Sequence, residues 1–576
     1  MTKSVNATLA MLMVTAAACG GSPIGGGPED PPIDPPDTEP EVVPPVDKVD
    51  LLLVVDNSMS MADKQAILAP SVRRLITNLV NPPCADANGP LPTEDQPAGP
   101  YDACPAGSTR VSEPLDDLRI GIISSSLGDL GSGACGSVEN ANDWGHLVTR
   151  TLDGSTVPTY QDHGFLVWDP AAQQSPPGET DLETLIQHAE SLIVGVNDIG
   201  CGYEMPLEAT YRFLADPAPY TELAMDSQGV LQPIGVDTYV LSQRSAFMRP
   251  DSFLGIVLLS DENDCSIDVA SPGHFFISSS DVYRPTSACA TDPDDACCTS
   301  CALPTPAGCA PDPVCDDPMG FAPQNLRCWD PKQQFGVDFK YPAARYINAL
   351  SAPTIDPSQS DLAASSGAGV ANPIFASGRH LQHVSLTAIV GVPWQDLVTD
   401  PTNPASPRKT TSQMETDGSW AWVTGRNSVD PLMRESIDPR GGNNPATGEP
   451  VNGANSINGG DRPSTGSLDP GIDLQYTCIF GLEEPIANGG DCDCGGVDCD
   501  SPICDGSTQV AAKAYPGKRQ LEVIRGLGDR GIAGSICPPV TNAQDPGGPL
   551  TYSAIADENY NQSMFALEYQ VRAQME

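Results

Sequence analysis

The stretch LLLVVDNSMSM, residues 51–61, decides the fold that this sequence predicts. Five apolar residues run without interruption into Asp56, and Ser58 and Ser60 follow at alternate positions. A continuous apolar run of this length is typical of a strand that is buried on both faces. Two interpretations of the polar residues are open: they cap the helix that follows, or they turn three oxygens toward one cation.

Apolar runs and amphipathic stretches alternate along the rest of the chain. Helices are expected at 61–80, 181–193, 204–215 and 518–528 and at the C-terminus, and Pro70 is expected to kink or end the first of them. Strands are expected at 49–56, 118–124, 253–262, 384–393 and 531–537, with an antiparallel neighbour at 164–168. This alternation predicts an α/β fold with a Rossmann-like, doubly wound and mostly parallel sheet.

The composition sets the class of protein. The chain has 576 residues and a formal net charge of −46, which disfavours binding to nucleic acid or anionic lipid. Its 54 Gly and 58 Pro residues imply long loops. Segments at about 265–335 and 394–516 lack helix or strand periodicity, so we expect two disulfide-rich insertions into one domain that spans 49–576.

The N-terminus predicts export. Residues 1–18 combine Lys3 with an apolar stretch that is too short for a stable membrane span. The small residues before Cys19 resemble a bacterial lipobox, which implies removal of the signal and lipidation of Cys19. The alternative is an ordinary signal cut after Ala18 that leaves a free thiol. Since Gly20 is not the Asp that often retains lipoproteins at the inner membrane, we expect an outer-membrane anchor, on the periplasmic or the cell-surface face.

The segment that follows predicts a spacer and an oxidising compartment. Residues 19–48 comprise Cys19 and an acidic, Pro-rich linker that cannot form a core. With Cys19 lipidated, 18 of the 19 cysteines remain, which is compatible with nine disulfides in an exported protein. The membrane is therefore expected as a partner only through the lipid anchor.

Two of the expected strands end in acid-rich loops, VVDNSMS at 54–60 and LLSDENDCS at 258–266. Ligands of an open α/β sheet bind outside the carboxyl ends of its strands. Mg²⁺ and Ca²⁺ prefer the oxygen ligands that carboxylates and hydroxyls supply. The sequence therefore predicts one divalent cation, Mg²⁺ or Ca²⁺, between these loops.

DNSMS fits the DxSxS motif of von Willebrand factor type A (VWA) domains, and LLSDE resembles a later strand of that family. The segments SDENDCS, GCGYEMPLEA and AYPGKRQL resemble cysteine-rich bacterial lipoproteins that carry this domain. The resemblance implies a metal ion-dependent adhesion site (MIDAS) with Asp56, Ser58 and Ser60 as ligands. It also implies Asp261 as a direct or water-mediated ligand, and a protein partner that offers an acidic group.

One departure from the family concerns the loop before the expected helix at 204–215. The family usually supplies a Thr ligand there, whereas NDIGCGYE, residues 197–204, contains neither Thr nor Ser. Glu204 is the candidate replacement, and Cys201 is expected in a disulfide. The loss puts ligand-dependent switching of affinity in doubt.

A second candidate is GGDCDCGGVDCDSPICDG, residues 489–506. Its four cysteines are expected in disulfides because an exported chain oxidises its thiols, although zinc ligation is the alternative. Its aspartates form either a solvated acidic loop or a Ca²⁺ site that lacks EF-hand spacing. No nucleophile, phosphate-binding or dinucleotide motif is present in the sequence.

The leading hypothesis is a non-enzymatic, lipid-anchored binding module that mediates protein binding or adhesion at the cell envelope. One alternative is a metal-dependent hydrolase of an envelope or extracellular polymer. Another is a structural envelope component whose metal site is sealed by the two expected insertions.

Overall fold

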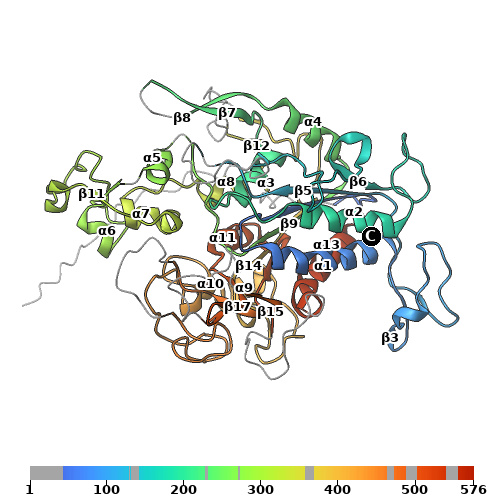
Figure 1. Ribbon diagram of the computed structural model, residues 1–576. Coiled ribbons are helices and arrows are strands. Elements are labelled where there is room, and N and C mark those ends of the chain that lie inside the picture. The colour runs from blue at the N-terminus through green and yellow to red at the C-terminus, as the bar shows by residue number, and fades with distance from the viewer. Residues whose placement is uncertain are drawn as a thin grey trace, which may run out of the picture. The chain divides into compact units, whose positions relative to one another are not determined.

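A six-stranded, mostly parallel sheet lies at the centre of the computed structural model (Figure 1). Every neighbouring pair in the sheet is parallel except β5 and β6, which are antiparallel. This arrangement confirms the predicted α/β class and the antiparallel neighbour at 164–168. In spatial order the strands are β18 (Gly531–Ser535), β14 (Val384–Val390), β9 (Phe253–Ser260), β1 (Val49–Val55), β5 (Leu118–Ser124) and β6 (Phe165–Trp168).

The described residues belong to one compact unit within Val43–Glu576. They are 43–128, 130, 142–227, 231–269, 271, 273–279, 281–356, 369–462, 473–487, 494, 502–539 and 555–575. The expected signal at 1–18, Cys19 and most of the linker lie outside them. Within these ranges, no helix has both the length and the apolar composition needed to cross a membrane.

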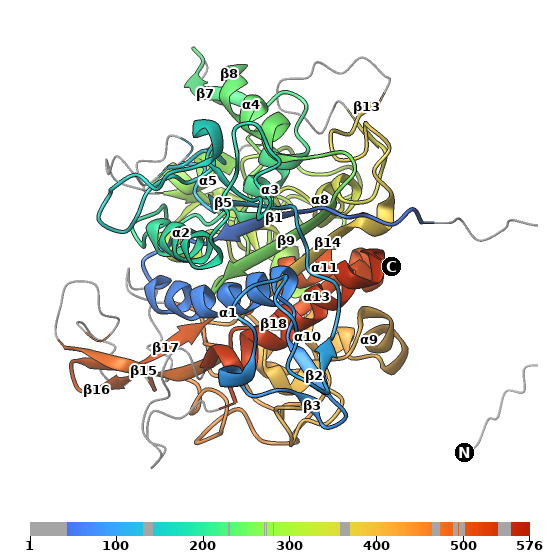
Figure 2. The same ribbon diagram turned by 90° about the vertical axis from the view of Figure 1, so that its right-hand side faces the viewer.

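Helices cover both faces of the sheet, and β1 is buried between them. Leu51, Leu53 and Val55 pack toward one helical layer, whereas Leu52 and Val54 pack toward the other; all five are at most 1% exposed. Figure 2 shows α1 and α13 on one side of β1, β9 and β14, and α3 and α8 on the other. The first layer holds α1 (Ala62–Val80), α2 (Leu182–Gly195) and α13 (Asn561–Met575), and the second holds α3 (Pro206–Leu214), α8 (Ala343–Ala349) and α11 (Lys518–Gly526).

Helix α1 runs through Pro70 without a break. Leu68 and Val72, which flank the proline by one half-turn, are fully buried against the sheet and α2. A proline removes one internal hydrogen bond, but packing of the apolar face keeps the helix continuous here. The expectation that Pro70 ends the first part of this helix was therefore wrong.

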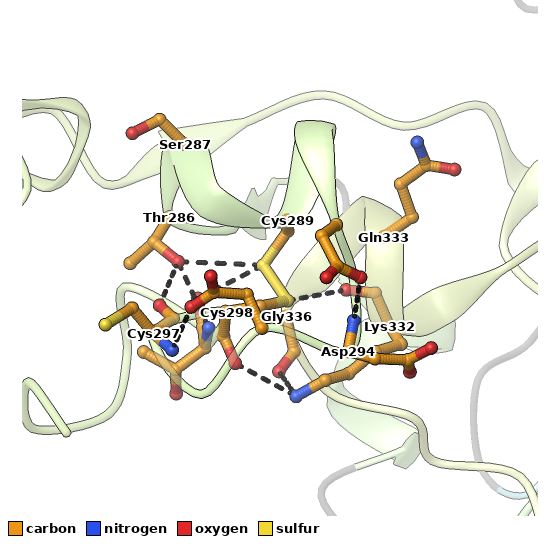
Figure 3. Close-up of a disulfide and its surroundings, with 12 residues drawn as sticks. Thr286, Ser287, Cys289, Asp294, Cys297, Cys298, Lys332, Gln333 and Gly336 are labelled. Carbon is orange, nitrogen blue, oxygen red and sulfur yellow. Dashed lines mark hydrogen bonds between the residues drawn. A yellow bond between two sulfur atoms is a disulfide. The ribbon is translucent and has the colours of Figure 1, made fainter. Parts of the chain in front are cut away.

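Short elements joined by disulfides fill the segment between β9 and β14 (Figure 1). Cys289–Cys298, Cys297–Cys309 and Cys301–Cys315 lie within it, and Cys265–Cys328 closes its base. Figure 3 shows Lys332, whose ammonium donates to the Cys298 and Gly336 carbonyls at 3.0 and 3.1 Å. The elements are α5 (Gly273–Ser278), β10 (Val282–Tyr283), α6 (Ser287–Thr291), β11 (Met319–Gly320), α7 (Pro331–Phe335), α8, β12 (Thr354–Ile355) and β13 (Val370–Ala371).

The segment 394–516 contains regular structure that the sequence did not predict. It forms a three-stranded antiparallel sheet of β15 (Cys478–Ala487), β17 (Thr508–Ala514) and β16 (Cys504–Asp505), preceded by α9 (Thr411–Asp417) and α10 (Trp420–Val423). The expectation that this segment lacks strands was wrong. Two disulfides fasten the sheet, Cys494–Cys504 within it and Cys478–Cys537 from β15 to the chain after β18.

Smaller elements complete the described chain. A three-stranded sheet of β2 (Cys84–Asp86), β3 (Gly89–Pro90) and β4 (Thr109–Arg110) follows α1 and carries the Cys84–Cys104 disulfide. A hairpin of β7 (Tyr220–Met225) and β8 (Leu231–Val236) precedes α4 (Thr238–Phe247). The disulfides among described residues, together with a disulfide-bonded Cys201, agree with the expectation for these cysteines.

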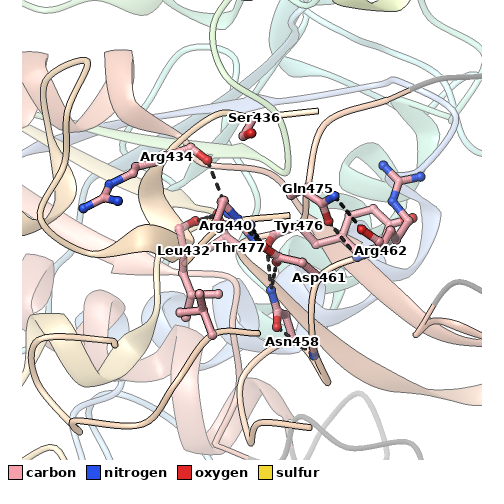
Figure 4. Close-up of polar contacts among 12 residues, drawn as sticks. Leu432, Arg434, Ser436, Arg440, Asn458, Asp461, Arg462, Gln475, Tyr476 and Thr477 are labelled. Atoms are coloured by element: carbon pink, nitrogen blue, oxygen red, sulfur yellow. Dashed lines mark hydrogen bonds and ion pairs between the residues drawn. The ribbon is translucent and has the colours of Figure 1, made fainter. Parts of the chain in front are cut away.

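A buried ion pair organises the loops before β15 (Figure 4). The Arg440 guanidinium donates to both carboxylate oxygens of Asp461, at 3.0 and 2.6 Å, and the two side chains are 3% and 1% exposed. It also donates to the Leu432 and Tyr476 carbonyls at 3.0 and 2.6 Å, and the Asn458 amide donates to Asp461 at 3.3 Å. Arg440 thereby joins segments that lie up to 36 residues away along the chain.

Candidate metal centre

The loops that follow β1 and β9 meet at one edge of the sheet. Val55 pairs with Leu259 across these parallel strands, and the Asp56 N–H donates to the Leu259 carbonyl at 2.9 Å. Asp261 follows β9 directly, so its carboxylate comes from the loop beside Asp56. The structure therefore brings the two acidic loops together, as the sequence predicts; their role as cation ligands stays a prediction.

The Asp56 carboxylate is fully buried and is held by an amide and two hydroxyls. Its Oδ1 accepts hydrogen bonds from the Ser58 N–H at 2.8 Å and the Ser125 hydroxyl at 3.2 Å. Its Oδ2 accepts one from the Ser260 hydroxyl at 2.7 Å. Burial and the negative charge of Asp261 raise the pKa of Asp56 to about 6, against the effect of these hydrogen bonds. A nearby cation would offset the charge of Asp261 and favour the ionised form of Asp56.

The helix-capping interpretation of this loop is wrong. The N-cap of α1 is Met61, whose side chain makes no capping hydrogen bond. The Asp56 carboxylate accepts from Ser58, inside the loop, and the Ser58 carbonyl accepts the Met61 N–H at 3.0 Å. These bonds shape the turn between β1 and α1 rather than satisfying the free N–H groups of the first helical turn.

Two predicted ligands carry buried oxygens without a hydrogen-bonding partner among the described residues. One is Ser58 Oγ, in a residue that is 5% exposed, and the other is Asp261 Oδ1, in a residue that is fully buried. Buried polar atoms in proteins nearly always have partners, because desolvation without a partner costs free energy. Ser60 is only partly buried. Hydroxyl and carboxylate oxygens of this kind are what Mg²⁺ and Ca²⁺ bind, so the residues fit such an ion.

Glu204 and Glu262 add two further carboxyl groups to the same cluster. Glu204 is buried, and burial together with the charges of Glu262 and Asp56 raises its pKa well above the ordinary value. Burial and the charges of nearby aspartates, Asp261 foremost, raise the pKa of Glu262 to about 8. Glu204 therefore lies beside the predicted ligands, whereas Glu262 was absent from the predicted set. The acidic run SDEND was the sequence signal for it.

Lys64 is the second residue of the cluster that the sequence did not single out. Its ammonium lies 3.0 Å from Asp261 Oδ2 and 3.2 Å from Asp63 Oδ1, and it donates to the Ser60 carbonyl at 2.7 Å. Burial alone lowers the pKa of Lys64, but the carboxylates of Asp63 and Asp261 outweigh it, and the pKa is raised. The side chain is therefore a buried cation inside the acidic cluster.

The loop at 197–204 supports the cluster by close backbone contact. The Gly200 N–H donates to the Asn57 carbonyl at 2.7 Å, and a Cβ added to Gly200 would lie 2.3 Å from the Asn57 amide oxygen. Gln65 joins this loop to the site, because its amide donates to the carbonyls of Asp56 and Asn197 at 2.9 and 2.8 Å. The loop that lacks the family's Thr therefore still packs against DNSMS.

Residues of the segment 473–515 lie against the other side of the cluster. The Tyr515 N–H donates to the Asp261 carbonyl at 2.7 Å, and the Phe480 ring centre lies 5.8 Å from the Lys64 ammonium. The loops at 57–60 and 197–200 reach the surface instead, where Met59 and Ile199 are 63% and 38% exposed. Each of these two loops therefore carries one exposed apolar side chain.

The acidic, cysteine-rich segment 489–506 offers few candidate metal ligands among the described residues. Cys494 and Cys504 form a disulfide, which excludes them as zinc ligands in this state, whereas Cys492, Cys499 and the aspartates at 491, 493, 498 and 500 lie outside the described residues. Throughout the described ranges, no group of three or more His, Cys, Asp and Glu side chains is arranged to hold a metal ion. A cation between β1 and β9 would therefore depend on serine hydroxyls as well as carboxylates.

Comparisons of the chain with protein-family models, with curated proteins and with solved structures find no match. The cluster at the ends of β1 and β9 is therefore interpreted from its own geometry.

Proposed function

We propose that this chain is an exported, lipid-anchored VWA-type binding module with one divalent cation at the ends of β1 and β9. Asp56, Ser58 and Ser60 hold the cation, and Asp261 does so directly or through water. When bound, Mg²⁺ or Ca²⁺ supplies a positive centre that completes its coordination with an acidic group of a protein partner. The observation that carries the proposal is the pair of buried, unpartnered oxygens, Ser58 Oγ and Asp261 Oδ1, where the two loops meet.

The sheet supports the same proposal. Its order places β1, which DNSMS follows, at the centre, beside β9, which Asp261 and Glu262 follow. Asp56 is oriented by three donors: the Ser58 N–H and the Ser125 hydroxyl on Oδ1, and the Ser260 hydroxyl on Oδ2, which leaves Oδ2 a further lone pair. Such hydrogen bonds fix the direction of a carboxylate ligand before it binds.

The exposed side chains Met59 and Ile199 support a partner at this edge. They flank the loops joined by the hydrogen bond from Gly200 to Asn57, and large apolar side chains are common at the centre of protein interfaces. A partner's carboxylate would enter between them, and its apolar neighbours would cover them.

Isothermal titration calorimetry with MgCl₂ and CaCl₂ tests the cation site. We expect the double variant Ser58→Ala/Ser60→Ala to lose cation binding and to keep its fold, because neither hydroxyl closes a hydrogen bond of the core. Ser456→Ala, at an exposed serine outside the cluster, is the matched control and should bind as the unaltered chain does. Equal affinity in all three proteins would refute the assignment of the ligands.

The hydrolase alternative has one specific observation in its favour. Glu262 is a carboxyl group next to Asp261 that the proposed ligand set does not use, and a carboxylic acid placed beside a substrate can serve as a general acid. Turnover of an envelope polymer by the purified chain, lost in Glu262→Gln, would favour this function. Cation-dependent capture of an envelope protein without turnover would favour adhesion.

A further inference from the structure

The Lys64 ammonium is surrounded by oxygen atoms, as a bound metal cation would be. Three oxygens lie within 3.2 Å of its nitrogen, one from each of Asp261, Asp63 and the Ser60 backbone. The Phe480 ring, 5.8 Å away, faces a fourth side. The Ser60 carbonyl accepts a hydrogen bond from the ammonium, and the two carboxylate oxygens lie within ion-pair distance of it.

The burial of Lys64 has a clear electrostatic reason. Its side chain is 2% exposed, and an isolated buried ammonium would be very costly. The neighbouring Asp261 is also fully buried, and it makes no other ion pair among the described residues. Lys64 is therefore the ion-pair partner of Asp261 among the described residues, and its ammonium is shared between Asp261 and Asp63.

We infer that Lys64 is a tethered cation that competes with the divalent ion for Asp261 and so lowers the affinity of the site. This inference rests on the proposed function, because it concerns the same ligands. Like charges a few ångströms apart in a buried site repel strongly, so a divalent ion beside Asp261 must displace the ammonium or share the carboxylate with it. In the absence of the ion, the ammonium neutralises Asp261 and keeps the two loops together.

Asp56 and Asp261 differ in the partners that they already have. Asp56 has hydroxyl and amide donors but no cationic partner among the described side chains, so it remains available to the divalent ion. Asp261 already has the Lys64 ammonium. The first aspartate thus sets whether a cation binds, and the second, through Lys64, sets how tightly.

The test removes the ammonium without changing the net charge of the cluster. Asp56, Asp63, Asp261 and Lys64 carry a formal charge of −2, and the double variant Lys64→Met/Asp63→Asn keeps that value because only Asp56 and Asp261 remain charged. Met has a similar length and packs well against an aromatic ring, here Phe480. We expect Mg²⁺ or Ca²⁺ to bind this variant at least about tenfold more tightly in calorimetry.

Two further proteins complete the design. Lys409→Met/Asp417→Asn removes another Lys–Asp pair, whose charged atoms are 3.0 Å apart, and should leave cation affinity unchanged. Lys64→Arg keeps the positive charge and should bind the cation no more tightly than the unaltered chain. Thermal unfolding in EDTA gives a second measurement: the Lys64→Met/Asp63→Asn variant should unfold at a lower temperature than the unaltered chain and recover when Ca²⁺ is added.

The outcomes separate this inference from the proposed function. If the unaltered chain binds the cation and the Lys64→Met/Asp63→Asn variant binds no more tightly, the competition is refuted and the cation site stands. A higher affinity of Lys64→Arg would also refute it. If neither the unaltered chain nor any variant binds Mg²⁺ or Ca²⁺, the cation site itself is refuted, and the inference with it.

Discussion

The molecule buries charge in two regions that differ in how completely the charges are satisfied. At Arg440 and Asp461, the guanidinium and the carboxylate are paired through two hydrogen bonds, and backbone carbonyls accept the remaining donors (Figure 4). At the ends of β1 and β9, a buried lysine ammonium is also paired, but Ser58 Oγ and Asp261 Oδ1 have no hydrogen-bonding partner among the described residues.

The difference shows which buried charges indicate a ligand. A fully paired ion pair is a structural device that orients loops, and it offers no atom to a further group. A buried acidic cluster with unpartnered oxygens has unsatisfied acceptors, and such acceptors need an explanation. Burial and charge are shared by both regions, so the unpartnered atoms are what distinguish the candidate site.

The largest loss of stability is expected when Arg440, whose donors are all paired, is replaced. Arg440→Met leaves the Asp461 carboxylate buried without its partner, which typically costs about 3–5 kcal/mol of unfolding free energy. Urea unfolding of the oxidised chain would measure this loss. Arg525→Met, which removes a largely exposed pair with Glu415, should change stability little. If both substitutions have the same small effect, the Arg440 network does not organise the fold as described.

An intermediate effect is expected from the loop that supports the candidate site. Gly200→Ala would place a Cβ 2.3 Å from the Asn57 amide oxygen, so the loop must shift, at a cost of about 1–3 kcal/mol. Because Asn57 precedes Ser58, we also expect weaker cation binding in calorimetry. Gly202→Ala is the matched control, since nothing lies within 4 Å of its added Cβ. Equal behaviour of the two variants would contradict the close packing of these loops.

The smallest change in the free energy of unfolding is expected when a third buried group, Asp396, is replaced by Asn. Asn444 Nδ2 donates to both Asp396 and Asp430, at 3.1 and 2.9 Å, and burial and the charge of Asp430 raise the pKa of Asp396 well above its ordinary value. Asp396→Asn is nearly isosteric, so the fold should tolerate it well.

The sign of this effect follows from the raised pKa. The folded chain retains a proton on Asp396 that the unfolded chain releases near pH 4, so the stability from this group is lost as pH rises above that value. Asp396→Asn does not titrate, and its stability relative to the unaltered chain should therefore increase between pH 5 and pH 8. Urea unfolding at both values measures it, and an unchanged relative stability would show that the aspartate is already ionised in the fold at pH 5.

The central strands were predictable because segments of seven or eight mostly apolar residues leave few alternatives. β1, β5, β9 and β14 begin at the predicted residues, and each is almost wholly buried. β15 was missed because its second half, EEPIA, is exposed and reads as loop. Its pairing with β17 joins residues across a long stretch rich in Gly and Asp, which local patterns do not reveal.

The candidate site was predictable only in part. Asp56 and Asp261 could be placed together because parallel neighbours end at the same edge, and a motif marked the first of them. Lys64 could not be found in this way, since a lysine in the first turns of an amphipathic helix is expected on its solvent face. Its burial depends on Asp261, which lies almost 200 residues later along the chain. Glu262 was visible as part of an acidic run, but its partial burial beside the other carboxyl groups required the three-dimensional packing.

The disulfide from Cys478 to Cys537 has a consequence for durability outside the cell. It closes a covalent ring, with a sequence separation of 59, that contains β15, β17, α11 and β18. Phe480 and Tyr515, which lie against the candidate site, belong to this ring. A protease that cuts one peptide bond inside it leaves both new ends attached to the same molecule. The part of the chain that covers the cluster therefore cannot be shed by a single cleavage there.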